Sequence, residues 1–318
     1  MPASPPAKRG DQRAFEARLA SIAHEIEALL QELLGDETED GEIARPPRLL
    51  EAMRYAVLSG GKRIRPFLVL ETAQLFDVRP EYGSMTAAAM ECVHAYSLIH
   101  DDLPAMDDDA LRRGRPTTHM AFDEATAILA GDALLTFGFD LLARERTYPD
   151  AGVRVALVAE LARAAGIGGM AGGQLLDLAA EGRFGKVQPA ATTEDAVTML
   201  EAMKTGALIR AACGMGAILG KASQAARGAL DRYGFALGKA FQIADDLLDL
   251  EGDPETLGKK TNKDAAAGKA TFIAILGVDG ARARLAALVA DAEAALGQFG
   301  EEAAMLRAAA RFVAERQT

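Results

Sequence analysis

The chain has 318 residues, half of them hydrophobic, which is enough to bury a substantial core. Its net charge of -11 and isoelectric point near 5.0 exclude a nucleic-acid-binding surface, because a phosphate backbone recruits basic patches and the sequence has no long basic run. Cys92 and Cys213 stand in apolar helical contexts, which favours reduced, buried thiols over a disulfide framework.

The chain begins with a proline-containing segment, 1–12, that has no apolar run of signal-peptide length. We predict a disordered tail there and no export signal. The most apolar later run, 127–143, is interrupted by two aspartates and is shorter than a bilayer span, so we predict a core helix and no transmembrane segment. Together with the reduced cysteines, these features predict a cytoplasmic protein.

Apolar residues recur at helical spacing along nearly the whole chain, and strand-like alternation is nowhere persuasive. The first such face begins with Phe15, Leu19 and Ile22, and it indicates an amphipathic helix. Because no linker separates two cores, we predict one all-α domain over 13–318. The predicted helices cover 11–34, 46–58, 63–77, 83–103, 119–146, 150–181, 194–220 and 223–250, and two more lie near the C-terminus.

The sequence GGKRIRP at 60–66 places three basic residues where one helix ends and the next begins. Glycines allow close backbone approach, a helix N-terminus presents amide donors, and guanidinium groups match phosphate oxygens. An anion site is therefore one interpretation of this segment, and a solvated basic turn is the other.

Five carboxylates crowd into nine positions in DDLPAMDDD, residues 101–109, directly after a helix that is apolar around much of its circumference. Two carboxylates about 4 Å apart repel by about 4 kcal/mol at an effective dielectric constant of about 20. These side chains must therefore either point into water or hold a cation.

A second acidic cluster occurs in FQIADDLLDLEGD, where Asp245 and Asp249 are four residues apart on one helical face. One acidic turn in a chain with 46 acidic residues is weak evidence for a site, but two such clusters inside apolar helices favour a bound cation. Sites made only of carboxylates suit Mg²⁺, which keeps several waters and bridges to substrate phosphates. We therefore expect magnesium and a phosphate-bearing ligand.

A series of motifs resembles the trans-prenyltransferases of the polyprenyl synthetase family, and most of all the short-chain bacterial farnesyl diphosphate synthases. In chain order they are GGKRIRP, ECVHAYSLIHDDLPAMDDDALRRGRPTTH, GDALLTFGF, GGQLLDL, MKTGALI, FQIADDLLDLEGD, TLGKKTNKD and GKATF. The resemblance implies an isoprenoid synthase fold, a large helical bundle around a deep central cavity, and a homodimer. It also implies a magnesium-dependent head-to-tail (1'-4) condensation of isopentenyl diphosphate with dimethylallyl or geranyl diphosphate, which gives (E,E)-farnesyl diphosphate.

The resemblance assigns roles by position. Mg²⁺, expected as three ions with substrate bound, would be held by Asp101, Asp102, Asp107 and Asp245. The expected catalytic residues are Asp101, Asp102, Lys204 and Asp245. The allylic diphosphate would contact Arg112, Lys204, Thr205, Gln242 and Lys259, and isopentenyl diphosphate would contact Lys62, Arg65, His94 and Arg113. Lys269 would approach a bound phosphate from the polar segment 252–270, which we predict to be a closing lid.

Tyr96 stands five residues before Asp101, about 7.5 Å along the same helix. By the resemblance its ring would form the floor of the product pocket, and by composition alone it would be a core tyrosine. His100 could orient the neighbouring aspartates through a hydrogen bond or be a satisfied core histidine. The alternatives to a farnesyl product are a geranylgeranyl or geranyl diphosphate synthase and, more distantly, a non-catalytic partner subunit.

Overall fold

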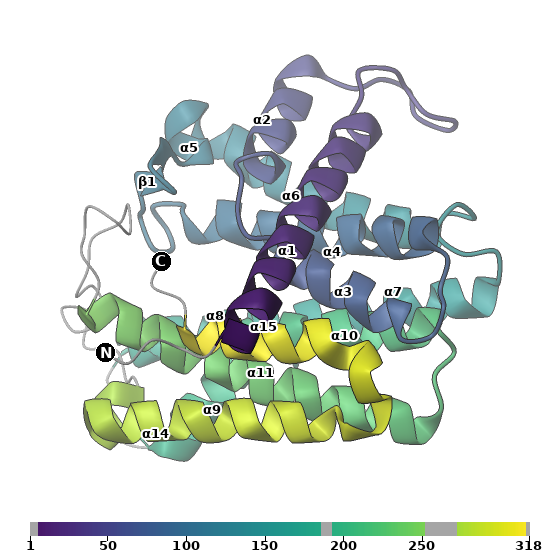
Figure 1. The fold of residues 1–318 in the computed structure, drawn as a ribbon. Coiled ribbons are helices and arrows are strands. Elements are labelled where there is room, and N and C mark those ends of the chain that lie inside the picture. Colours follow the sequence, from purple (N-terminus) through teal and green to yellow (C-terminus); the bar gives the residue numbers. More distant parts are fainter. Residues whose placement is uncertain (1–5, 186–192, 252–271, 316–318) are drawn as a thin grey trace.

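The structure is a computed structural model, and it describes residues 6–185, 193–251 and 272–315 (Figure 1). Most of these residues are helical. The first half of the chain contains α1 (Pro6–Leu33), α2 (Pro47–Val57), α3 (Ile64–Gln74), α4 (Pro80–Asp101), β1 (Leu111–Arg112), β2 (Arg115–Pro116), α5 (Thr118–Ala121) and α6 (Glu124–Ala143). The second half contains α7 (Ala151–Ala165), α8 (Met170–Ala180), α9 (Glu194–Glu201), the π-helical turn η2 (Ala202–Gly206), α10 (Ala207–Leu219), α11 (Gln224–Glu251), α14 (Phe272–Ala295), the 3-10 turn η3 (Gly297–Ala303) and α15 (Ala304–Glu315).

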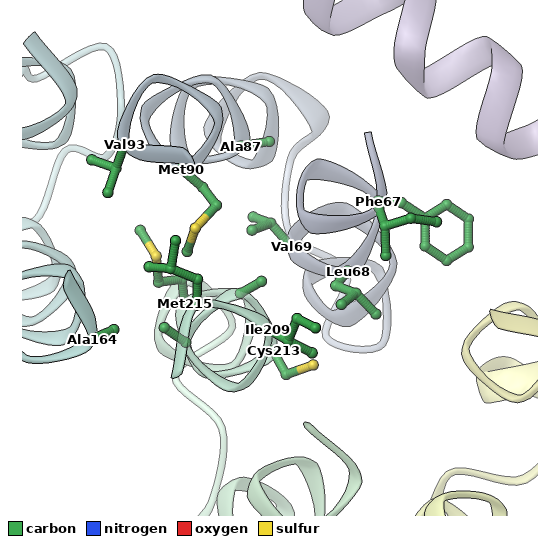
Figure 2. Packing of buried hydrophobic residues seen from close by; sticks show 14 of the residues in the cluster. Phe67, Leu68, Val69, Ala87, Met90, Val93, Ala164, Ile209, Cys213 and Met215 are labelled. Atoms are coloured by element: carbon green, nitrogen blue, oxygen red, sulfur yellow. The ribbon is translucent and has the colours of Figure 1, made fainter. Parts of the chain in front are cut away.

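Helix α4 lies at the centre of the bundle, where it packs against α3, α6 and α10. Its residues from Gly83 to Val93 are buried around the whole circumference, as the apolar composition of 83–103 predicts. Figure 2 shows Met90 of α4 and Val69 of α3 pointing toward the helix that carries Met215. This continuous core holds the C-terminal end of α4 in a fixed position, and the first aspartate motif begins there.

Three stretches are long and apolar enough to cross a membrane by length and composition alone: Glu124–Ala143, Ala151–Ala180 and Glu194–Leu219. The first includes the run 127–143, and at 20 residues it is not too short for a span, contrary to the sequence prediction. In the structure Leu134 and Leu141 of this helix are fully buried against neighbouring helices. These leucines of α6 therefore belong to the helical core, whereas Ile128 and Leu129 of the same helix are exposed.

The structure divides three of the helices that the sequence predicts as continuous. The predicted helix 119–146 becomes α5 and α6, and 150–181 becomes α7 and α8 because the glycine-rich sequence 166–169 ends the first of the pair. Within 194–220, the π-helical turn η2 separates α9 from α10. A π-helical turn is rare and occurs mostly at functional sites.

At the N-terminus, α1 begins at Pro6, inside the segment 1–12 that we predict as a disordered tail. The structure therefore differs from that prediction over 6–12, and residues 1–5 lie outside the described residues. Cys92 and Cys213 are buried free thiols, as predicted, and burial raises the pKa of Cys213 to about 12. An unreactive, protonated thiol is the expected form of both.

Candidate active site

One cavity of about 400 Å³ collects residues from several of the predicted motifs. The predicted site residues that line it are Arg65 of α3, His94, Tyr96 and Asp101 of α4, and Lys204 and Thr205 of η2. The cavity thus brings a cation from GGKRIRP, the first aspartate motif and the lysine of MKTGALI to one space. These segments are far apart in the sequence, and the packing of α3, α4 and η2 joins them.

The first aspartate motif starts on the last turn of α4 and folds back on itself. The amide of Asp107 donates to the carbonyl of Asp101 over 2.8 Å, and the amide of Asp109 donates to the carbonyl of Asp102 over 3.2 Å. These bonds satisfy carbonyl groups that the end of the helix leaves without partners. The loop 103–109 therefore keeps Asp107 beside Asp101, although five residues separate them in the sequence.

Asp102 is buried and does not point into the cavity. The Arg112 guanidinium binds its carboxylate with two nitrogens, Nε at 2.9 Å and Nη2 at 2.7 Å from Oδ1. Burial raises the pKa of Asp102, and Arg112 opposes that shift. Two residues that we predict to bind the allylic substrate and its metal, Arg112 and Asp102, therefore bind each other in this structure.

Asp101 is the carboxylate that the cavity leaves least compensated. Its pKa is raised to about 7, chiefly by burial, while Lys204 acts to lower it and the neighbouring Asp107 acts to raise it. A partly buried carboxylate of this kind gains stability when a cation arrives, and an all-oxygen donor set suits Mg²⁺. Among the described residues, no three His, Cys, Asp or Glu side chains are close enough to hold a metal by themselves. This fits a metal that takes its remaining ligands from a bound phosphate and from water.

The carboxylates of the second aspartate motif have different surroundings. Asp246 is buried, accepts from Gln242 Nε2 at 3.0 Å, and accepts from the amide of Phe272 at 3.1 Å, which ties α11 to the start of α14. Asp245 is half-buried on a neighbouring face of α11. Figure 1 shows α4 and α11 ending on the same side of the molecule, so the two motifs share that side.

The π-helical turn η2 presents Lys204 and Thr205 to the cavity. Lys204 Nζ pairs with the buried carboxylate of Asp177 on α8, and Thr205 Oγ1 donates to Gln242 Oε1 at 3.3 Å. The turn packs closely on α8, because a Cβ at Gly173 would lie 2.2 Å from the Lys204 amide nitrogen. The wide turn and this glycine together place the lysine beside Asp101.

Sequence reasoning did not identify Gln174 and Asp177 as site residues. Gln174 lines the cavity, and its buried Nε2 makes no hydrogen bond to the residues described. Asp177 is the partner of Lys204. The motif GGQLLDL carries the missing signal, since a spacing of three puts both polar side chains on one face of an otherwise apolar helix.

The arginines of the basic turn 60–66 have different partners. Arg63 is 5% exposed and pairs with Glu91 at 2.5 Å and Glu27 at 2.9 Å, so it anchors the turn and is unavailable to a ligand. Arg65 lines the cavity, its Nη1 lies 3.2 Å from His94 Nε2, and its Nε is buried without a partner among the described residues. Burial lowers the pKa of Arg65 to about 10, which leaves it charged at neutral pH.

His94 is neutral in this arrangement. Burial and the nearby guanidinium of Arg65 lower its pKa well below the usual value. Its Nε2 therefore accepts a hydrogen bond from Arg65, which leaves that guanidinium oriented along the cavity wall. Two of the four residues predicted to bind isopentenyl diphosphate, Arg65 and His94, are thus brought together.

The hairpin β1–β2 directs two consecutive arginines to different partners. Its turn residues Arg113 and Gly114 both have positive φ, 52° and 73°, which is the geometry of a type I′ turn. Arg112 reaches Asp102, and Arg113 Nη1 donates to the carbonyl of Gly60 in the basic turn. Lys62 is exposed, with its Nζ 5.3 Å from the centre of the Phe312 ring.

Gly61 makes room for Arg113. A Cβ at Gly61 would lie 2.6 Å from Arg113 Nη1, and the φ of this residue is +124°. Because the resemblance assigns Arg113 to isopentenyl diphosphate, we expect Gly61→Ala to displace the Arg113 guanidinium and to raise the KM for that substrate by about tenfold or more, with little change in kcat. Steady-state kinetics with this substrate varied measures the effect.

The matched control is Gly60→Ala. Its φ is also positive, +77°, but nothing lies within 4 Å of a Cβ there. Both variants carry backbone strain of about 1 kcal/mol or more. An equal rise in KM for the two variants would show that strain, and not the position of Arg113, is responsible.

Two predicted substrate-binding residues, Lys259 and Lys269, lie outside the described residues, and so does the predicted lid 252–270. Gln242, Arg112, Arg113, Lys62, Asp107 and Asp245 are described but do not line the cavity itself. They remain predictions as ligands of substrate or metal.

One cavity of this helical bundle is lined by a carboxylate, a lysine and an arginine, which are side chains suited to a metal ion and a phosphate group: Asp101, Lys204 and Arg65. Comparison with known proteins shows which class of protein has such a bundle. The family model for polyprenyl synthetase matches residues 46–305. The farnesyl diphosphate synthase of Escherichia coli (strain K12) is 47% identical over 274 residues, which cover 84% of this chain and 89% of that protein.

Two further relatives bear on the fold and on product length. The geranylgeranyl diphosphate synthase of Cyanophora paradoxa is 37% identical and is covered over 96% of its length. The crystal structure of an FPP/GFPP synthase from Zymomonas mobilis, without ligand, has a TM-score of 0.83 at 42% identity, and the match covers 95% of this chain and 99% of that one. The chain belongs to the polyprenyl synthetase family, and the predicted all-α isoprenoid synthase fold is confirmed.

Proposed function

We propose that this trans-prenyltransferase condenses isopentenyl diphosphate head to tail with dimethylallyl and then geranyl diphosphate, and releases (E,E)-farnesyl diphosphate. The observation that carries the proposal is the single cavity in which Arg65 and His94 face the same space as Asp101, Lys204 and Thr205. Two anionic substrates can bind side by side there, each with its own cations. The farnesyl diphosphate synthases among the relatives support this choice of substrates.

In this proposal the allylic diphosphate lies between the two aspartate motifs. Asp101, Asp102, Asp107 and Asp245 would hold Mg²⁺, three ions in all, which when bound offset the charge of the departing diphosphate. Lys204 and Thr205 contact the same diphosphate, and Arg112 exchanges Asp102 for a phosphate oxygen. Arg65, with Lys62, Arg113 and His94, holds isopentenyl diphosphate.

The chain promotes the reaction by position and charge. The bond between the allylic carbon and the diphosphate oxygen breaks, and both bonding electrons leave with the diphosphate beside Lys204. The double bond of isopentenyl diphosphate, aligned by Arg65, then supplies the electrons of the new carbon–carbon bond. The proton lost from the adjacent carbon passes to the released diphosphate. Tyr96 and the apolar wall formed by Met170, Leu175 and Leu178 exclude water from the cation.

We further propose a cytoplasmic homodimer. Ile128 and Leu129 of α6 are 44% and 57% exposed in one chain. A second copy packed on this part of α6 would bury these two side chains. Light scattering of the purified protein tests this, and a monomer at micromolar concentration would contradict it.

The test of the function is a product assay. Purified protein, Mg²⁺, labelled isopentenyl diphosphate and each allylic starter are incubated, and the products are separated by chain length. A farnesyl product supports the proposal, whereas a geranylgeranyl or geranyl product favours the alternative synthases. A thermal shift with Mg²⁺ and pyrophosphate but no product would indicate a non-catalytic partner subunit.

A further inference from the structure

Gly131, the first of the two glycines in the motif GDALLTFGF, has no role in the binding scheme above, yet it is buried where α6 crosses α4. A Cβ built on Gly131 would lie 2.2 Å from Nε2 and 2.5 Å from Cδ2 of His100. Real Cβ atoms essentially never approach so closely, so the imidazole occupies the space that any larger residue would need.

His100 is fixed in that space by its hydrogen bond. Its Nε2 lies 3.1 Å from the carbonyl oxygen of Ile128, which can only accept, so Nε2 carries the proton. The Asp132 carboxylate lies 3.9 Å from the same nitrogen but is mostly exposed. His100 thus turns toward α6, and none of its described hydrogen bonds orients the aspartates beside it.

The other side of the imidazole faces the product cavity. His100 lines that cavity together with Tyr96, and the two rings meet edge to face with centroids 5.7 Å apart and planes at 80°. This arrangement is a favourable one for two aromatic rings. Tyr96 is one helical turn from His100 on α4, so the imidazole supports the tyrosine ring from the side of the aspartates.

We propose that Gly131 and His100 are positioning residues for product length: the missing side chain at Gly131 seats the imidazole of His100, which in turn fixes the Tyr96 ring in the cavity. The inference rests on the proposed function, since it concerns the length of the prenyl chain. The inference assigns a specific role to Gly131 of GDALLTFGF. The end of the pocket is then set by three residues in contact and not by Tyr96 alone. We call these three residues, Gly131 of α6 with His100 and Tyr96 of α4, the relay.

The relay predicts opposite results for two substitutions. Gly131→Ala pushes the imidazole away from α6 into the cavity it lines, which makes the pocket shorter and raises the ratio of geranyl to farnesyl product. His100→Ala removes the support of Tyr96 and opens the wall, which shifts the product toward geranylgeranyl diphosphate. We expect about tenfold in each ratio, the lower end of the range for one misplaced carbon in an apolar pocket.

The double variant Gly131→Ala/His100→Ala tests whether Gly131→Ala changes product length through His100 or through a general disturbance of the fold. The added methyl group then has room, so this variant should give the long products of His100→Ala and should fold as well as that variant. If Gly131→Ala does not fold, His100→Ala and the double variant still test the inference. Short products from the double variant would overturn it.

Gly138→Ala is the matched control. It lies on the same face of α6, and its Cβ would be 2.8 Å from Val93 Cγ2, a residue that does not line the cavity. We expect a lower melting temperature with an unchanged product ratio. A ratio changed as much as in Gly131→Ala would show that any strain between α4 and α6 alters product length.

Failure of this inference is distinguishable from failure of the proposed function. If the unaltered protein makes no prenyl product, the function is wrong. If it does and Tyr96→Ala lengthens the product, while Gly131→Ala and His100→Ala leave the ratios unchanged, only the relay is wrong. The relative kcat/KM for dimethylallyl and geranyl diphosphate provides a second readout that loss of stability would not shift.

Discussion

Replacing Asp101 by asparagine is expected to lower kcat by about 10²- to 10³-fold, the usual cost of removing one group that stabilises developing charge. Asp101 lines the cavity, and the neighbouring Lys204 is already paired with Asp177. Asparagine keeps the shape of the side chain but is a poor ligand for Mg²⁺. The KM for isopentenyl diphosphate should change little, because the other set of cations holds that substrate.

The melting temperature shows whether the lower kcat of Asp101→Asn comes from lost chemistry or from lost stability. Burial is the main cause that raises the pKa of Asp101 to about 7, so its negative charge destabilises the fold unless a cation compensates it. Asp101→Asn should therefore melt at the same temperature as the unaltered protein or higher, while Mg²⁺ with pyrophosphate should stabilise it less. The control is Asp140→Asn, an exposed residue on α6 that pairs with Arg144. Full activity of Asp101→Asn would remove Asp101 from the metal site.

Replacing Tyr96 by alanine is expected to change the main product from farnesyl to geranylgeranyl diphosphate. The ring lines the cavity on the same helix as Asp101, and its loss would let a longer chain extend along α4. Tyr96→Phe keeps the ring and should keep the product. Chromatography of dephosphorylated products from matched turnovers measures the shift.

Tyr82→Ala is the control for this experiment. Tyr82 is on the same helix, but it packs against Tyr148 and does not line the cavity. It should lower stability and leave product length unchanged. An unaltered product distribution in Tyr96→Ala would exclude Tyr96 as the floor and would place the limit of the pocket on other residues of its wall.

The second aspartate motif shows which features the sequence predicts and which it does not. A spacing of four puts Asp245 and Asp249 on one face of α11, and in the structure both are half-buried, whereas Asp246 is buried and accepts hydrogen bonds from Gln242 and from the amide of Phe272. Helical periodicity determines which residues share a face, so the pairing of Asp245 with Asp249 could be predicted from the sequence. The partner of each face depends on which helix packs there, and periodicity does not contain that information.

In the basic turn 60–66, too, the sequence does not reveal which partner each arginine has. Nothing in GGKRIRP separates Arg63 from Arg65, since both are arginines near a helix start. The fold buries Arg63 between Glu27 and Glu91, and it aims Arg65 into the cavity. The choice is made by two glutamates that lie 36 and 28 residues away in the sequence. Burying an arginine is tolerated only where such partners exist.

The sequence by itself determined the all-helical class, the family and the positions of the two aspartate motifs, because apolar spacing and ordered motifs are local properties. Only the tertiary structure decided that η2 is a π-helical turn, that Asp177 holds Lys204, and that Gly131 seats His100 against Tyr96. Each of these depends on how closely two helices approach. That distance is set by packing between segments far apart in the chain, where a single missing Cβ leaves room for a neighbouring ring.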